Sequence, residues 1–176
     1  MRRILLAFVL LSTFPAQAAE LKLSTWNLSW LTLRSPDDPV LPRDLARRQP
    51  GDWRLLAQYA QRLAADIVAF QEVDGAEAAE RIFPAADYAL FLARENDVQR
   101  TGFAIRRHLR ATQNEDLAGL DLNPHATRSL RRGTDVTVEW GGMRLRLLSI
   151  HLKAGCREDP LSASQRPECG EVARQV

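Results

Sequence analysis

Three strand-like segments of this chain end in polar side chains that together could perform metal-assisted chemistry. Residues 21–28, 66–73 and 143–153 have apolar bodies, and their C-terminal ends carry Asn27, Glu72 and His151. If the three strands lie side by side, these side chains meet at one rim of the core. A carboxylate and an amide oxygen suit Mg²⁺ or a similar ion, and an imidazole exchanges a proton near neutral pH. Such a set suits phosphate ester cleavage, although each residue taken alone is more often a turn former, a solvated acid or a structural histidine.

The elements that must position these side chains alternate between strands and helices. Expected strands are 21–28, 66–73, 88–93, 102–105, 134–140 and 143–153, the last two joined by a Gly141-Gly142 turn. A helix is expected over 53–65 after a possible N-cap at Asp52, a second over 76–82, and a third from Arg166. Residues 35–43 and 107–133 are expected to be irregular. The mixture predicts an α/β or α+β layered fold with a partly antiparallel sheet.

The N-terminus has the pattern of a secretory signal peptide. Arg2 and Arg3 precede the apolar run 4–11, and Ala16-Gln17-Ala18 follows as an A-x-A site. The run is short for a membrane span, so we expect residues 1–18 to be removed, rather than kept as a buried helix or an anchor. The domain would then be residues 19–176, secreted or periplasmic and without a membrane anchor.

Signal removal also changes the charge balance. Two of the 24 basic residues lie in 1–18, which leaves 22 basic residues against 22 acidic ones. A neutral chain does not bind nucleic acid through bulk charge, so any affinity for phosphate must come from a local site. The sequence gives no indication of oligomeric state.

Two cysteines, Cys156 and Cys169, close a short loop in a chain that is expected to be exported. In an oxidising compartment such a pair is plausibly a disulfide, with two free thiols as the alternative.

Several segments, in order, resemble the endonuclease/exonuclease/phosphatase superfamily, which has the DNase I-like fold. They are STWNLSWL, DIVAFQEVDG and LLSIHLKAGC, with RTGFAIRR and LRRGTDVTVEW between the second and the third. The resemblance covers the mature chain and is strongest to secreted bacterial members with H-L-K-x-G-C. It implies a sandwich of two mostly antiparallel sheets flanked by helices.

The resemblance also implies roles for individual residues. Asn27 and Glu72 would serve a Mg²⁺ (or other divalent cation) site, and His151 would contact the scissile phosphate and assist proton transfer. Arg131 is the better match for a phosphate-contacting arginine, with Arg132 and Arg128 as competitors. Lys153 could add positive charge or be a solvated lysine. His108 and His125 match no motif and are taken as structural.

The family's later motifs, G-D-x-N and S-D-H, do not occur after residue 153. The sequence therefore predicts an incomplete sandwich, the N-terminal part of a metal-dependent phosphoester hydrolase, a secreted endonuclease or phosphodiesterase that acts on a phosphoester such as nucleic acid. A phosphatase or phospholipid phosphodiesterase on the same fold, and an inactive remnant, are the alternatives. Without the missing groups, residues 19–176 alone are expected not to hydrolyse phosphodiesters at a useful rate.

Overall fold

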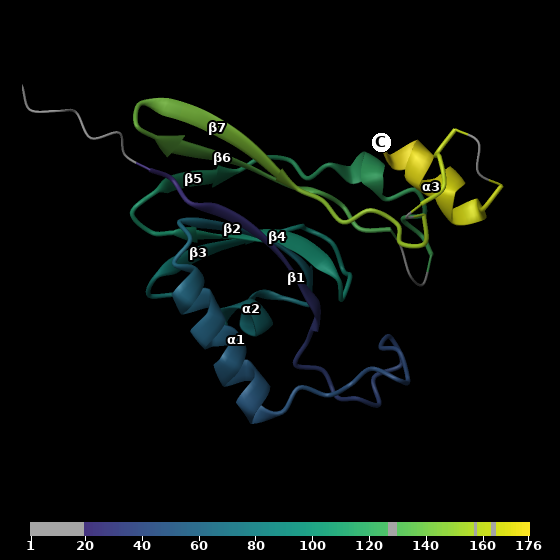
Figure 1. Cartoon of the computed structure of the whole chain (residues 1–176), viewed down its shortest axis with the longest axis horizontal. Helices are drawn as coiled ribbons and strands as arrows, with labels where there is room; N and C mark the ends of the chain where they lie inside the picture. The colour runs from purple at the N-terminus through teal and green to yellow at the C-terminus, as the bar shows by residue number, and fades with distance from the viewer. Residues whose placement is uncertain (1–19, 127–129, 157, 163–164) are drawn as a thin grey trace, which may run out of the picture.

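Two β-sheets packed face to face form the body of the protein (Figure 1). The structure is a computed structural model that describes residues 20–126, 130–156, 158–162 and 165–176. The signal peptide expected at 1–18 lies outside these residues.

The first sheet carries two of the three polar strand ends. Its strands, in spatial order, are β1 (Leu23–Leu31), β2 (Ile67–Val73), β4 (Arg100–Arg106) and β3 (Tyr88–Leu92). β1 and β2 are parallel, and the other neighbours are antiparallel. A parallel pair needs a long crossover, and the segment that contains helix α1 (Pro50–Leu63) supplies it. β2 is central and almost continuously apolar, as expected for a strand buried on both faces.

The second sheet is an antiparallel set of three strands. It contains β5 (Arg110–Gln113), β6 (Thr134–Trp140) and β7 (Met143–Ser149), in that order. The predicted β6–β7 hairpin is confirmed, and Gly141 and Gly142 have φ values of 56° and 79°, which a tight primed turn requires. β5 lies in a stretch that was expected to be irregular, and β7 ends at Ser149 rather than at Lys153.

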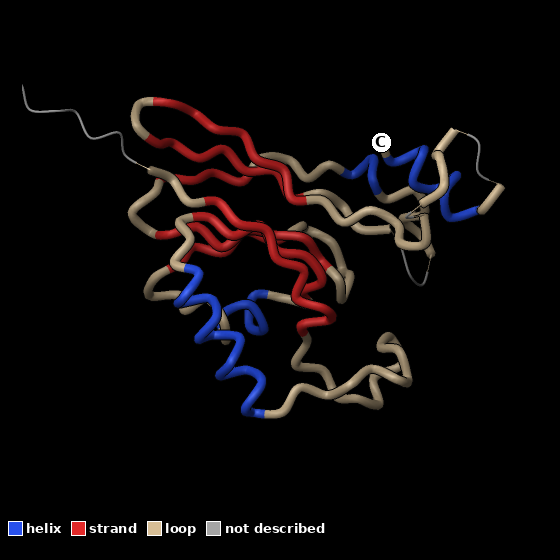
Figure 2. The backbone as a smooth tube through the Cα atoms, viewed as in Figure 1, coloured by secondary structure: helices blue, strands red, loops and turns tan. Residues whose placement is uncertain are grey.

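The hydrophobic core has two layers. One lies between the first sheet and the helices α1 and α2 (Ala76–Glu80), with Phe70 and Phe83 fully buried (Figure 2). The other lies between the sheets, where Phe103 and Val136 are buried. The predicted α+β fold of two mostly antiparallel sheets is thus confirmed.

The last helix, α3 (Pro167–Gln175), lies beside the short 3₁₀ helix η1 (Ala118–Leu120), away from α1 and α2 (Figure 1). The amide of Gln175 joins the two by donating to the carbonyl of Leu120 at 2.7 Å. The helix expected from Arg166 is confirmed.

The expectation that Asp52 caps α1 is wrong by three positions. The N-cap is Gln49, and Asp52 sits in the first turn, where its carboxylate accepts the Gln49 backbone N–H at 2.6 Å. Pro50 explains the earlier start, because proline is favoured in the first helical turn.

Candidate functional site

The neighbouring ends of β1 and β2 depart from regular strand geometry. Their pairing register shifts between Asn27 and Leu31, and the β2–β4 register shifts between Phe70 and Val73. Ser29, Trp30 and Glu72 have φ values of 49°, 55° and 62°, in the left-handed region that residues with a Cβ rarely adopt. Bulges re-aim side chains, and strained backbone tends to gather at functional sites. This end of the sheet is therefore the first place to look for one.

The Glu72 carboxylate is the centre of the contacts at this end. Its Oε1 accepts the Asn27 side-chain amide at 2.8 Å, and its Oε2 accepts the Trp30 backbone N–H at 3.1 Å. The Asn27 carbonyl oxygen in turn accepts the Ser29 N–H at 2.8 Å. The side chain of Glu72 is 14% exposed, whereas Asn27 is open to solvent. The Asn27 side chain is therefore fixed beside the Glu72 carboxylate at an accessible position, with its amide nitrogen toward Glu72 and its oxygen toward the Ser29 N–H.

Arg48 holds the turn that follows Asn27. Its guanidinium donates to the carbonyls of Leu28, Ser29 and Trp30 at 2.5, 2.6 and 2.9 Å. Burial lowers the pKa of Arg48 from its usual value, against the opposing effect of Asp52 and Glu72. These bonds offset part of the cost of the two left-handed residues and keep the Trp30 N–H directed at Glu72.

His151 reaches this centre from the other sheet. The expectation that the three strands lie side by side is therefore wrong for β7, which lies in the second sheet. The Ser149 hydroxyl donates to the Phe70 carbonyl at 3.0 Å and accepts the Gln71 amide at 3.1 Å, which ties the end of β7 to β2. Two residues later, His151 Nε2 lies 3.5 Å from Glu72 Oε1. The three predicted polar residues do meet, across the two layers rather than along one sheet.

The imidazole of His151 is in an environment that favours its neutral form. Burial lowers its pKa and Arg131 lowers it further, while Glu72 and Asp97 act in the opposite direction. Its Nδ1 atom is buried and has no hydrogen-bond partner among the described residues. At pH 7 His151 is therefore neutral and able to accept a proton.

Of the two candidate arginines that the structure describes, Arg131 is the one that lines the cleft with Glu72 and His151. The Arg132 guanidinium instead donates to the Arg94 carbonyl at 3.4 Å. Arg128 lies outside the described residues. Lys153 also lines the cleft, but its ammonium group is 3.5 Å from Glu171 on α3. Of the remaining histidines, His108 lies 3.6 Å from Asp66 and His125 is exposed in a turn, so neither belongs to this cleft.

The backbone next to Arg131 is anchored by Glu95, which lies between β3 and β4. Both carboxylate oxygens of Glu95 accept the Arg132 N–H, at 3.2 and 3.1 Å. Burial raises the pKa of Glu95 to about 7, Asp97 and Asp121 add to the rise, and Arg132 opposes it. Glu95 thus titrates near neutral pH beside the residue that is the candidate phosphate contact.

We expect Glu95→Gln to make the protein more stable above pH 7. The folded-state pKa is raised from 4.5, so folding favours the protonated acid, and the stability that this gives is lost as the pH rises through 7. Glutamine still accepts the Arg132 N–H and carries no charge. Urea unfolding at pH 5 and pH 8 measures the effect, with the exposed Glu139→Gln as control. A variant that loses the same stability at both pH values would contradict this assignment.

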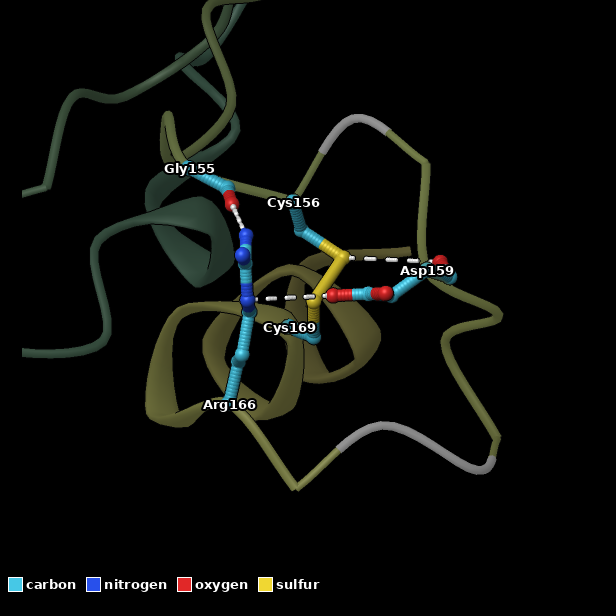
Figure 3. The surroundings of a disulfide bond; sticks show 5 residues. All are labelled: Gly155, Cys156, Asp159, Arg166 and Cys169. Atoms are coloured by element: carbon cyan, nitrogen blue, oxygen red, sulfur yellow. Dashed lines mark hydrogen bonds and ion pairs between the residues drawn. A yellow bond between two sulfur atoms is a disulfide. The ribbon is translucent and has the colours of Figure 1, made fainter.

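A disulfide lies next to residues that line the cleft. Cys156 and Cys169 are bonded, with a sequence separation of 13 residues (Figure 3). Gly155, Arg166 and Glu168 adjoin this bridge and line the same cleft as His151. The Arg166 guanidinium lies 3.2 Å from Asp159 and donates to the Gly155 carbonyl at 3.3 Å. The bridge therefore constrains a side of the cleft that carries the positive charge of Arg166 and the negative charge of Glu168.

We expect the paired change Cys156→Ala and Cys169→Ala to lower the free energy of unfolding by about 3 kcal/mol, as the chain-entropy estimate for a loop of this length gives. Urea unfolding beside the oxidised protein measures the loss. Thiol titration of denatured, unreduced protein from an oxidising compartment should find no free thiol. Two free thiols there would refute the bridge.

The donor set at Glu72 fits a hard divalent cation. Carboxylate and amide oxygens are preferred ligands of Mg²⁺, which commonly takes only one or two protein carboxylates and completes its shell with water and substrate phosphate. No group of three or more His, Cys, Asp or Glu side chains able to hold a metal occurs among the described residues. The site can therefore offer the ion the Glu72 carboxylate, and the Asn27 oxygen once that amide turns over, with room in a cleft of about 760 Å³ for a phosphate.

Several residues of the site were not foreseen. The Trp30 backbone N–H donates to Glu72, Arg48 donates to backbone carbonyls, and Gln71 donates to the Ser149 hydroxyl at the end of β7. A sequence pattern does not reveal such contacts. The one available signal was the position of Trp30 in the stretch STWNLSWL, which also supplies Asn27.

No protein-family model and no curated protein matches this chain. Several solved structures are similar to it. Truncated Caenorhabditis elegans TDP2 is 17% identical, with a TM-score of 0.54 over 77% of this chain and 47% of its own. Humanized D. rerio TDP2 is 19% identical, with a TM-score of 0.50 over 73% of this chain and 45% of its own.

An endonuclease/exonuclease/phosphatase from Bacteroides vulgatus is also similar, at 14% identity and a TM-score of 0.45, over 73% of this chain and 51% of its own. The chain thus spans about half the length of the solved structures it matches. At these identities the likeness concerns the fold.

Proposed function

Because the chain has the DNase I-like fold of the endonuclease/exonuclease/phosphatase proteins, we propose that its cleft belongs to a metal-dependent phosphoester hydrolase, an endonuclease or phosphodiesterase. The observation that carries the proposal is the 3.5 Å contact between Glu72 and His151, made by strands of two different sheets. A carboxylate that can hold a cation and a neutral imidazole then face one open cleft, beside Arg131.

Each residue has a distinct part. Glu72 and Asn27 would hold Mg²⁺ or a similar ion, which would polarise the phosphoryl oxygens of a bound ester. Arg131 pairs with the phosphate charge, and its Nε is buried without a hydrogen-bond partner in the described part of the chain. His151 accepts a proton or a hydrogen bond at the phosphate, because the cleft keeps it neutral.

The remaining catalytic groups are proposed to come from sequence outside these 176 residues. Two carboxylates of the described residues, Glu72 and Glu168, line the cleft, and Glu72 is the one that contacts Asn27 and His151. The solved relatives are about twice as long as the region they share with this chain. We place residues 19–176 as the N-terminal portion of such a domain, secreted or periplasmic after removal of 1–18. Within the described residues, no helix has the length and apolarity to cross a membrane.

The alternatives are a phosphatase or phospholipid phosphodiesterase on the same fold, and an inactive remnant. Hydrolysis of DNA and of a chromogenic phosphodiester separates them, measured with Mg²⁺ and with EDTA. The assay compares the 176-residue chain with the protein encoded when the DNA beyond codon 176 is included.

The expected result is Mg²⁺-dependent cleavage by the longer protein and no useful rate from the 176-residue chain. Cleavage that persists in EDTA would contradict the metal assignment. Rapid, His151-dependent cleavage by the shorter chain would contradict the proposed contribution from outside it. A longer protein that cleaves neither substrate would favour the remnant.

A further inference from the structure

Trp30 lines three hollows of the described part of the chain, only one of which contains Glu72 and His151. Another is a pocket of about 220 Å³ between the segment after β1 and the start of α1, lined in part by Trp30, Arg34, Leu41, Leu45, Arg48 and Trp53, and called here the tryptophan pocket. We propose that the tryptophan pocket binds a nucleobase of the substrate whose phosphate lies in the cleft. This inference rests on the proposed function and deepens it.

The connection between the tryptophan pocket and the cleft is direct. Trp30 lines both of them, and its backbone N–H donates to the Glu72 carboxylate at 3.1 Å. A ring that contacts Trp30 therefore lies against the residue whose backbone N–H is bonded to Glu72, the proposed ligand of the cation. A nucleotide unit, with its base joined to its phosphate through one sugar, has the form to occupy both hollows together.

The protein holds Trp30 rigidly. Ser29 and Trp30 are consecutive left-handed residues, which is unfavourable for side chains with a Cβ. Arg48 offsets this by donating to three carbonyls of the same turn. A backbone held in this way leaves the indole less freedom to lose when a ring stacks on it, which favours binding.

The facing wall is fixed as well. The Arg34 guanidinium donates to Asp74 at 2.8 Å and to Asp38 at 3.1 Å. Asp74 directly follows β2, two residues after Glu72, and it also accepts the Thr32 hydroxyl at 2.7 Å. The wall of the pocket and the Glu72 site are thus built on the same strand end.

The composition of the walls favours a planar ring over an acyl chain. Two indoles and the guanidinium groups of Arg34, Arg47 and Arg48 line the pocket. Bases stack on both kinds of group, and their polar edges can accept hydrogen bonds from guanidinium. An acyl chain would lie against the same charged groups and accept no hydrogen bond from them. The volume is also below the ~300–1,000 Å³ of sites for drug-sized ligands, which suits a single ring system.

Binding of a matched pair of probes to the 176-residue protein, with Mg²⁺, tests this inference. Adenosine 5′-monophosphate carries the base, and ribose 5-phosphate lacks it. Calorimetric titration should give at least fivefold tighter binding of the first probe. Trp53→Leu, which keeps an apolar side chain at the base of the pocket, should remove that advantage and leave ribose 5-phosphate binding unchanged. Tyr59→Leu is the control, since Tyr59 is an aromatic residue of the same helix that is 50% exposed outside this pocket.

The outcomes separate this inference from the proposed function. Equal affinity for the two probes, or no binding of adenosine 5′-monophosphate, overturns the base site. Binding of a short-chain phospholipid that Trp53→Leu weakens, without binding of the nucleotide, overturns it in favour of an acyl site. Failure of the proposed function has a different signature, namely ribose 5-phosphate binding that is insensitive to Mg²⁺ and to His151→Ala. If Trp53→Leu proves unstable, Arg47→Gln replaces it, because Arg47 is an exposed lining residue, and unchanged nucleotide affinity in that variant overturns the inference.

Discussion

Glu72→Gln should weaken Mn²⁺ or Mg²⁺ binding by roughly 100-fold or more, and remove the metal-dependent hydrolysis of the longer protein. Losing a residue that only hydrogen-bonds to a metal ligand costs about 10- to 100-fold in affinity. Glu72 is the cleft carboxylate beside Asn27 and His151, so we expect it to be the ligand itself. Glutamine has the same size and keeps an acceptor for the Trp30 N–H, so the fold should survive. Calorimetric titration with Mn²⁺ measures the affinity.

The matched control for Glu72 is Glu139→Gln, which removes a half-exposed carboxylate of β6 outside the cleft. It should leave the metal affinity unchanged. Thermal unfolding of both variants, without metal, shows whether either change harms the fold. Equal Mn²⁺ affinity in wild type and Glu72→Gln would show that Glu72 is not a ligand of the ion.

His151→Gln should lower the hydrolysis rate of the longer protein by about 10²- to 10⁴-fold, the usual contribution of a positioned acid or base. The buried imidazole has a lowered pKa, so it stays neutral at pH 7 and remains so somewhat below pH 6.5. Activity that needs the neutral form should therefore be kept at pH 7 and be lost only as the pH falls through the lowered pKa.

The pH profile of the rate, with and without the substitution, checks this assignment. The fall in rate at acidic pH should disappear in His151→Gln. It should remain in His108→Gln, which changes an exposed histidine beside Asp66. A fall in rate with its midpoint above pH 6.5, or an unchanged rate in His151→Gln, would contradict the role given to this residue.

The strand ends could be predicted from the sequence because hydrophobic periodicity marks where a strand stops being apolar. Asn27, Glu72 and His151 each follow such a run, and all three meet. The pairing of strands could not be derived in this way, since periodicity does not say which sheet a strand joins. β7 thus reaches the site across the core, through the hydroxyl of Ser149.

Arg48 and Trp30 show why the rest of the site escaped prediction. Arg48 acts on the backbone carbonyls of residues about twenty positions earlier, and any sequence would offer carbonyls there. The left-handed conformation of Trp30 is also not marked by a glycine or an asparagine. Contacts to the backbone depend on the folded geometry and have no side-chain signature.

The competing arginines were separated by packing. Arg131 and Arg132 are neighbours in the sequence, but the Arg132 N–H is held by Glu95 and its guanidinium turns to Arg94. Arg131 is left to line the cleft. The contacts of Arg132 with Glu95 and Arg94 therefore decide which of the two arginines lines the cleft.

Crystals of the protein grown with Mn²⁺ and phosphate show directly whether the cleft binds a divalent cation, because manganese is located by its anomalous scattering. We expect a manganese peak beside the Glu72 carboxylate and the Asn27 amide oxygen, with phosphate between the ion and Arg131. The peak should be absent from Glu72→Gln crystals grown in the same way. Manganese bound elsewhere, with Glu72 still bonded only to Asn27 and Trp30, would contradict the proposal that this cleft is a metal-dependent phosphoester site.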